Sequence, residues 1–369
     1  MERAPAAKAV TLDDLRRAAV TRSLFTPVTL QRALDALGFV QADPIRAPAR
    51  AQDLTLRHRV TGYRAGDLER RYARLDVHED FFVNYGFVTH AVQALMHPRG
   101  GPTPWDAARG RHVRALLDFV RTRGAAHPRE VDDHFSHGTV TNYWGGSSSA
   151  TTHLLDAMHY RGLLRVVRRE AGIRIYGAHE HDAAPLGAVT RRARLDALVD
   201  VLVRKYAPLP AASLSTLVRR LRLAVPQWSG ELDRALQRAK RRLAHARVDG
   251  VDWYWPDGDD CADAEPGDVV RLLAPFDPVV WDRRRFEILW GWAYRFEAYT
   301  PVPKRKLGYY ALPLLWRDRV IGWGNVSVKN GRLQCDVGYT ASHPPAGRLF
   351  RRALADELDR MRVFLGLES

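Results

Sequence analysis

The stretch SATTHLLDAMHYRGLLRVVRREAGIRIY, residues 149–176, decides the fold more than any other part of the chain. Its first part has the apolar spacing of a helix that stops at Gly162, and its second part alternates polar and apolar residues on both sides of Ala171-Gly172, as a β-hairpin does. Two further helices are expected before it, over 106–123 and from Pro128 onward. Three helices followed by a hairpin is the element order of a winged helix, which places its last helix in a DNA groove.

The same element order is expected in two other parts of the chain. Helices over about 11–20 and 29–37 lead into a strand at 39–43, and residues 190–256 form a looser copy. After the acidic segment 257–260 the sequence is rich in aromatic, β-prone residues, and an amphipathic helix over 349–365 closes the chain. We therefore predict an α+β, mainly helical protein of tandem winged-helix (helix-turn-helix) units at 1–105, 106–182 and 190–256, with a small carboxy-terminal β-barrel and terminal helix at 266–369.

The composition predicts a polyanionic partner. The chain of 369 residues has 57 Lys and Arg against 42 Asp and Glu, a formal net charge of +15, so nucleic acid is the expected ligand. Only Cys261 and Cys335 are present, which excludes a disulfide framework and a four-cysteine zinc site and fits a reducing cytoplasm. No stretch is apolar enough for a signal peptide or a membrane span, so we expect a cytoplasmic protein that makes no membrane contact.

Two polar residues, Gln41 and Asp43, stand at the end of the strand expected at 39–43. If the alternation of the strand holds, both side chains face one side and Ala42 faces the other. A carboxylate can take a proton from water and stabilise positive charge while an amide fixes the water, so the pair suits hydrolysis at a cation-like centre. The alternative is structural, and from spacing alone it is the commoner outcome: Asp43 bonds to nearby backbone in a turn before Pro44.

Candidate DNA contacts are spread along the chain. They are Arg46, Arg50 and His58 after the polar pair, Ser147, Ser148 and Ser149 at the start of the third helix of the second unit, Arg241 and Arg242 in a basic run, and Lys304, Arg305 and Lys306 near the carboxy terminus. Such residues bind phosphates, but they also serve as salt bridges, as a helix cap or as a solvated helix face. The histidines show no metal-ligand spacing, so no metal is expected at His134, His137, His153 or His159.

Three longer stretches carry a resemblance to a known family. They are GFVQADPI at 38–45, LLAPFDPVVWDR at 272–283 and YTPVPKRKLGYY at 299–310. In this order, and over nearly the whole chain, they resemble the YcaQ/AlkZ-type bacterial DNA glycosylases. The resemblance implies tandem winged helices with a carboxy-terminal β-barrel, and excision of N7-alkylated purines, with interstrand crosslinks unhooked by some members. The family motif is Gln-x-Gln in AlkZ and Gln-x-Asp in the YcaQ-like branch, so Gln41-Ala42-Asp43 looks like the second type.

The implied chemistry agrees with the roles that the residues suggest by themselves. N7 alkylation leaves a cationic base that departs easily, so a carboxylate near C1′ and a placed water suffice, without a metal or an organic cofactor. Asp43 would activate the water and stabilise charge, and Gln41 would position the water. No lysine stands beside Asp43 in the sequence, which favours hydrolysis over Schiff-base lyase chemistry. The expected partner is double-stranded DNA with alkylated or crosslinked purines, bound by a monomer in the bacterial nucleoid.

One segment departs from the family, and one other function fits the chain. FFVNYGF at 81–87 stands where many YcaQ-like sequences have Tyr-Trp-x-His-Glu, so a histidine and a carboxylate are replaced and the substrate preference is open. A winged-helix transcription regulator without catalysis would also explain the repeated helices and the charge. It predicts sequence-specific binding that does not depend on Asp43.

Overall fold

The computed structural model describes residues 9–100, 104–135, 138–141, 147–180, 186–259, 265–341, 345 and 347–367. Residues 9–100 form a helical unit around a small antiparallel sheet with strand order β1-β3-β2. Its elements are α1 (Leu12–Ser23), α2 (Leu30–Leu37), β1 (Phe39–Gln41), α3 (Ala51–Leu56), α4 (Asp67–Arg71), β2 (Val77–Phe81), β3 (Tyr85–Thr89) and α5 (His90–Met96), with a 3₁₀ turn, η1, at Tyr72–Arg74. Helices α1 and α2 lie where the sequence predicted them: α1 starts in a capping box between Thr11 and Asp14, and α2 ends at left-handed Gly38.

The second unit contains the three helices and the hairpin that the sequence predicted. They are α6 (Ala107–Arg123), α7 (Pro128–Phe135), α8 (Ala150–Tyr160) and the strands β6 (Leu164–Glu170) and β7 (Ile173–Ala178). The hairpin turns at Ala171 and Gly172, both with positive φ, as this short connection requires. A small strand pair that was not predicted, β4 (Thr139–Thr141) with β5 (Ser147–Ser149), lies between α7 and α8. Residues 142–146, which directly precede the three candidate serines, lie outside the described residues.

Residues 188–255 repeat this order. The elements are α9 (Ala188–Tyr206), β8 (Leu209–Pro210), α10 (Ala211–Arg220), η2 (Leu221–Leu223), η3 (Pro226–Glu231), α11 (Leu232–Arg242), β9 (Ala244–Val248) and β10 (Val251–Trp255). The chain leaves α11 at Leu243 and forms a hairpin that turns at Asp249 and Gly250, again with positive φ. Whether these units bind DNA as winged helices stays a prediction.

The carboxy-terminal part is a half-barrel, an open antiparallel sheet in place of the complete small barrel that was expected. Four antiparallel strands form an open sheet in the order β11 (Val270–Leu272), β12 (Leu312–Trp316), β13 (Arg319–Lys329) and β14 (Arg332–Tyr339). Helix α12 (Arg283–Trp290) and η4 (Val302–Lys304) lie in the long connection after β11, and α13 (Arg348–Leu365) packs against β11. The β-prone segment 294–299 forms no strand: Tyr294 is buried there in irregular backbone and donates a hydrogen bond to the carbonyl of Ala311.

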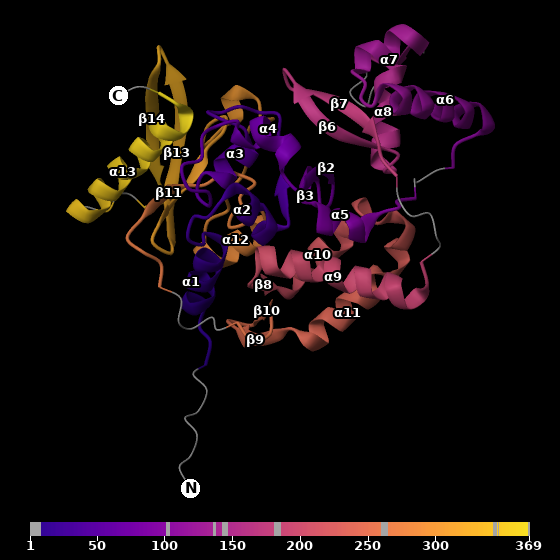
Figure 1. Cartoon of the computed structure of the whole chain (residues 1–369). Coiled ribbons are helices and arrows are strands. Elements are labelled where there is room, and N and C mark those ends of the chain that lie inside the picture. Colours follow the sequence, from indigo (N-terminus) through magenta and orange to yellow (C-terminus); the bar gives the residue numbers. More distant parts are fainter. Residues whose placement is uncertain are drawn as a thin grey trace.

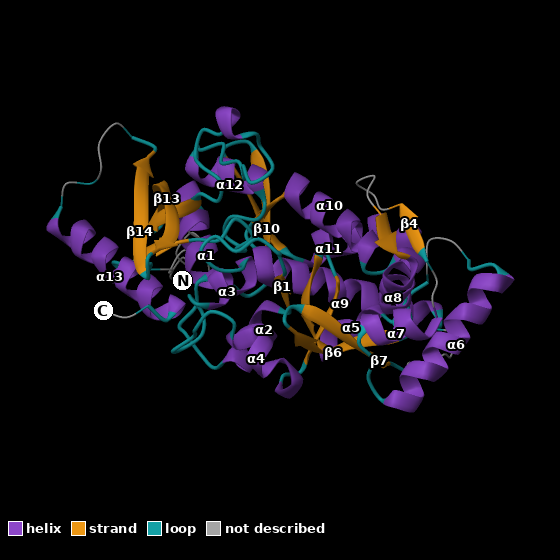
Figure 2. Cartoon of the chain, turned by 90° about the horizontal axis from the view of Figure 1, so that it is seen from above, coloured by secondary structure: helices purple, strands orange, loops and turns teal. Residues whose placement is uncertain are grey.

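The first unit lies at the centre of the molecule. In Figures 1 and 2, α6–α8 stand at one end and the β13–β14 sheet with α13 at the other, with the first unit and α9–α11 between them. Its side chains share hydrophobic clusters with each of the other parts. A buried ion pair adds a polar link: Arg59 donates to both oxygens of Asp277 at 2.7 and 3.0 Å, and neither side chain is exposed. In the described part of the chain, the helices are too short or too polar to span a membrane.

Candidate active site

Strand β1 holds the first residue of the candidate pair in the central sheet. It pairs with β3 so that Gln41 lies opposite Gly86. A Cβ atom on Gly86 would lie 2.2 Å from the carbonyl oxygen of Val40, so only glycine lets the two strands approach this closely. The segment 81–87, which departs from the family pattern, therefore includes a glycine that the sheet requires. Backbone pairing with this glycine fixes the position of Gln41.

The Gln41 amide is buried and held by a tryptophan. The side chain is only 6% exposed, and its Oε1 accepts a hydrogen bond from the indole Nε1 of Trp281 at 2.7 Å. Trp281 in turn packs against Tyr206 and lies under the guanidinium of Arg220. Because the amide oxygen is engaged, its two N–H donors remain for a ligand. They adjoin a cavity of about 390 Å³ that Gln41 lines together with Asn84 and Trp281.

Asp43 is half-buried and forms no ion pair with any residue that the structure describes. Its Oδ1 accepts a hydrogen bond from the backbone N–H of Ile45 at 2.9 Å, so the turn given above as the structural alternative does form. Burial raises the pKa of Asp43, and the bond from Ile45 offsets part of that rise. The turn occupies one carboxylate oxygen and leaves Oδ2 for a ligand.

The prediction that Gln41 and Asp43 face one space is wrong in the free chain. Strand β1 ends at Gln41, so the alternation of side chains does not extend to Asp43. Asp43 lines a different cavity, of about 500 Å³, where the β6–β7 hairpin meets the first unit. The two cavities lie on either side of the turn after β1.

The cavity beside Asp43 is lined by arginines that already have partners. Each pairs with a carboxylate of the protein: Arg50 with Glu69, Arg169 with Glu79 at 2.6 Å and Arg174 with Asp156 at 3.0 Å. Arg169 and Arg174 come from the β6–β7 hairpin and were not among the candidate site residues named from the sequence. The sequence predicted the hairpin itself, but nothing in it showed which unit of the protein the hairpin would contact.

A buried carboxylate, Glu79 on β2, ties the hairpin to the central sheet. It accepts hydrogen bonds from Arg169 at 2.7 and 2.6 Å and from the hydroxyl of Tyr85 at 2.6 Å. Tyr85 lies in the segment that departs from the family, and its ring lies beneath the guanidinium of Arg174. Charge-assisted bonds of this kind fix a wall of the cavity, and the sequence could not show a contact between residues 79 and 169.

The three candidate DNA contacts that follow Gln41 and Asp43 in the sequence have different surroundings in the structure. Arg46 is exposed, and Arg50 lines the cavity beside Asp43. The prediction for His58 is wrong: its ring is 8% exposed, and its Nε2 lies 3.0 Å from the carbonyl oxygen of Leu272. Burial lowers the pKa of His58 well below its usual value, which keeps the ring neutral. It lies just after α3, where this part of the first unit contacts β11 of the half-barrel.

The other candidate contacts lie outside both cavities. Ser149 caps α8 and donates to Asp132 at 3.0 Å, while the side chains of Ser147 and Ser148 lie outside the described part. Arg242 pairs with Asp200 at 2.6 Å, and Arg305 donates to the carbonyl of Thr300 at 2.8 Å. Arg241, Lys304 and Lys306 are exposed. Across the described ranges, no His, Cys, Asp and Glu side chains are grouped to hold a metal ion; His137 and Cys261 lie outside those ranges.

The family of the chain follows from its sequence as a whole. The model of the family described as DNA glycosylase AlkZ-like matches residues 34–364. The chain belongs to the AlkZ-like DNA glycosylase family. This AlkZ-like glycosylase is therefore an enzyme that acts on DNA, and a regulator without catalysis is set aside.

A solved structure supports the same fold. DNA glycosylase AlkZ of Streptomyces sahachiroi superposes on this AlkZ-like chain with a TM-score of 0.64, covering 97% of this chain and 98% of that one. The sequences are 14% identical, so the match shows a shared α+β fold with a half-barrel and leaves the substrate to be argued from the site.

Proposed function

We propose that this AlkZ-like glycosylase hydrolyses the N-glycosidic bond of N7-alkylated purines in duplex DNA, with Asp43 as the catalytic carboxylate. One observation carries this: the half-buried carboxylate of Asp43 has no cationic partner among the described residues, although arginines line the same cavity. An N7-alkylated purine is positively charged, and this charge passes to the sugar as the bond breaks. A carboxylate that the protein has not neutralised stabilises such a charge where water is partly excluded.

The step balances with groups that the site supplies. The C1′–N9 bond breaks, its electron pair leaves with the base, and the departing purine becomes neutral without a proton donor. The oxygen of a water molecule bonds to C1′, and its proton passes to Asp43. Neither a metal nor a redox cofactor is needed for this balance.

Gln41 has the role of holding the water. Trp281 occupies its amide oxygen, so the amide presents N–H donors in a fixed direction. Gln41 and Asp43 line different cavities in the free chain. When DNA is bound, the two side chains must therefore contact the same nucleotide from different sides of the turn after β1. The bound nucleotide would then lie at the end of β1, between Trp281 and the β6–β7 hairpin.

Hydrolysis without lyase chemistry is supported by the position of the nearest buried lysine. Lys205 donates through Nζ to the carbonyl of Phe39 beneath β1 and is 5% exposed. Burial and the neighbouring Arg59 lower its pKa well below the usual value, but the amine lines neither cavity. A Schiff base needs an amine that reaches C1′, so the proposed enzyme is monofunctional.

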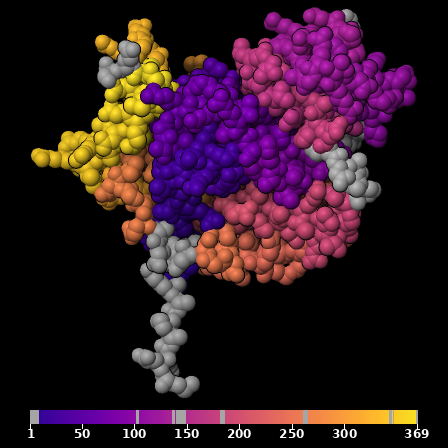
Figure 3. Space-filling model, viewed as in Figure 1, coloured from indigo at the N-terminus to yellow at the C-terminus, as the bar shows by residue number. Residues whose placement is uncertain are grey.

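Bulky adducts and interstrand crosslinks belong to the same proposal. The cavity beside Asp43 lies where two units meet, and Figure 3 shows a notch between the first unit and the lobe of α6–α8. Chemistry at such a junction does not require a bulky nucleotide to enter a deep pocket. We also propose that the three helix–hairpin units serve as winged helices, with exposed Arg46, Arg241, Lys304 and Lys306 on phosphates.

The test is base release from a duplex that carries one N7-methylguanine, without added metal. We expect free N7-methylguanine and an abasic site in an uncut strand, and no release from the unmodified duplex. A bulkier N7-guanine adduct and an N7 crosslink follow in the same assay. Strand cleavage at the abasic site would contradict the monofunctional mechanism, and failure to release any N7-alkylated purine would overturn the substrate class.

A further inference from the structure

The connection between β11 and β12 carries two of the most exposed large apolar side chains in the described part of the chain. Tyr299 is 78% exposed and Val302 is 69% exposed, and both stand in the segment YTPVPKRK at 299–306. Single apolar residues are common on protein surfaces, but these two stand three positions apart on one loop. Neither lines a catalytic cavity, and the proposed hydrolysis does not use them.

The loop that presents this pair is held in shape from inside by a carboxylate. Glu297 is 8% exposed, and its two oxygens accept hydrogen bonds from the backbone N–H groups of residues 306–308 at 2.8–3.2 Å. The side chain of Arg305 crosses the loop and donates to the carbonyl of Thr300 at 2.8 Å. Prolines on both sides of Val302 restrict the backbone further. A loop ordered in this way loses little conformational entropy when it binds a partner.

A row of aromatic rings joins the loop to the catalytic cavity beside Gln41. Phe276 lines that cavity, and its ring centroid lies 5.4 Å from the centroid of Phe296. The ring of Phe296 in turn lies 6.1 Å from that of Tyr299. Tyr299 is therefore the outermost ring of a row that begins at the cavity wall.

A second ring links the same row to Asp43. Tyr310 is 3% exposed and meets the Phe296 ring at an edge, with centroids 5.2 Å apart. Burial and the neighbouring Asp43 raise the pKa of Tyr310. The aromatic row thus reaches towards both proposed catalytic residues, and DNA placed over them would meet the exposed end of the row at Tyr299.

The charges around the loop suit a polyanion. Arg295, Lys304 and Lys306 are exposed and form no ion pair with a described residue. Within residues 295–308 the single carboxylate is Glu297, which the loop itself encloses. Uncompensated cations around an apolar pair match the chemistry of DNA, whose phosphates lie outside and whose apolar base faces lie inside. A protein partner would have to be acidic around an apolar centre, and the adjoining catalytic site gives no reason for one.

We propose that this loop is a wedge that enters a DNA groove beside the damaged nucleotide, with Tyr299 and Val302 against base faces. Apolar side chains in a groove unstack a base step, and an aromatic ring stacks on any base. The inference rests on the proposed catalytic site and adds the residues that open the base stack there. Such a wedge strains the stack at the lesion without drawing a bulky nucleotide into a deep pocket.

The experiment measures base unstacking and affinity with a duplex that does not react. A 2′-fluorine on the sugar of the N7-methylguanosine suppresses base release, and a neighbouring 2-aminopurine becomes more fluorescent when its stacking is broken. The full-length chain is compared with Tyr299→Ser, Val302→Ser and the conservative Tyr299→Phe. Val189→Ser, at a similarly exposed valine in the first turn of α9, is the matched control. Base release from the ordinary N7-methylguanine duplex is measured for the same proteins.

We expect the wild type to raise the 2-aminopurine fluorescence. Tyr299→Ser should lose most of this rise and bind the duplex about tenfold more weakly, with a smaller loss in Val302→Ser. Tyr299→Phe keeps the ring, so it should behave as the wild type does, and so should Val189→Ser. A wild type that unstacks the duplex but releases no base would support the wedge and contradict the proposed reaction.

Three results would overturn the wedge. The first is a Tyr299→Ser protein with unchanged fluorescence and affinity. The second is weaker binding in Tyr299→Ser when the wild type itself gives no fluorescence rise, which would show a surface contact only. The third is self-association in light scattering that Tyr299→Ser abolishes without an effect on DNA, which would assign the pair to a contact between two copies of the chain.

Discussion

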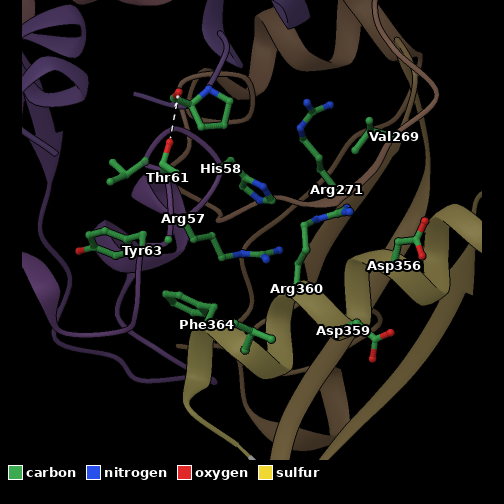
Figure 4. A pocket seen from close by; sticks show the side chains of 14 residues that line it. Arg57, His58, Thr61, Tyr63, Val269, Arg271, Asp356, Asp359, Arg360 and Phe364 are labelled. Atoms are coloured by element: carbon green, nitrogen blue, oxygen red, sulfur yellow. Dashed lines mark hydrogen bonds between the residues drawn. The ribbon is translucent and has the colours of Figure 1, made fainter. Parts of the chain in front are cut away.

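The cavity beside Asp43 and the cavity beside Arg271 are both lined by arginines, but their charges are arranged in opposite ways. At the first, Arg50, Arg169 and Arg174 are each paired with a carboxylate, and Asp43 is left without a cation among the described residues. The second is a cavity of about 820 Å³ between the loop after α3, β11 and α13 (Figure 4). There, Glu357 is shared by two arginines, and Arg271 is left without an anion in the same part of the chain. The turn after β1 and strand β11 thus carry opposite unmatched charges, on Asp43 and Arg271.

This difference shows that the number of arginines lining a cavity does not indicate the charge of its ligand. The number of cations is the same in the two cavities, so counting basic residues cannot distinguish them. The unpaired group distinguishes them: a free carboxylate suits a substrate with developing positive charge, and a free guanidinium suits an anion. The following predictions alter one unpaired group or its support at a time.

The largest effect is expected for Asp43→Asn. This change keeps the size of the side chain and the bond from Ile45 but removes the charge, so single-turnover base release should fall by roughly 10²- to 10⁴-fold. Duplex binding should be retained. Asp76→Asn, whose side chain is 80% exposed, is the control and should release base at the wild-type rate. Equal rates for the two variants would refute the role of Asp43.

Removing the shared carboxylate should have the next largest effect. Glu357→Gln leaves Arg57 and Arg360 without their buried counter-charge, which should lower the free energy of unfolding by about 3–5 kcal/mol in urea titration. Glu287→Gln on exposed α12 should change stability by less than about 0.5 kcal/mol. A Glu357→Gln protein as stable as wild type would contradict the charge arrangement of this cavity.

A smaller effect is expected for Trp281→Phe. The variant keeps an aromatic ring but loses the 2.7 Å bond that fixes Gln41, so base release should slow by roughly three- to tenfold. Trp290→Phe loses a comparable indole bond, to the carbonyl of Asp318, and is the matched control. If both variants slow the reaction equally, the effect is one of packing and Trp281 does not position Gln41.

Much of the fold was predictable because it rests on local signals. The cap at Thr11, the helix stop at Gly38 and the turn at Ala171-Gly172 are decided by neighbouring residues, and the structure has all three. The half-barrel was not, because the segment 294–299 has aromatic residues with strand propensity but forms irregular backbone, in which Tyr294 is buried and Tyr299 is 78% exposed. Closure of a sheet depends on distant strands, and no local pattern reports it.

The candidate site was predictable only in part for the same reason. The sequence indicated Gln41 and Asp43, but it missed Trp281, although this residue lies in one of the three stretches that carry the family resemblance. The contact of Arg169 with Glu79 joins residues ninety positions apart and left no local signal. His58 shows the reverse error, since closeness in sequence to Asp43 did not bring it to the same cavity.

The most direct test of the central claim, that an ionised Asp43 drives hydrolysis, is the pH dependence of single-turnover N7-methylguanine release. Burial raises the pKa of Asp43, so the rate should fall tenfold per pH unit as the pH drops through a value above that of an ordinary aspartate, after subtraction of spontaneous depurination. The residual rate of Asp43→Asn should lack this acid limb. A wild-type rate that does not change over the acid range, or an acid limb that persists in Asp43→Asn, would contradict the account.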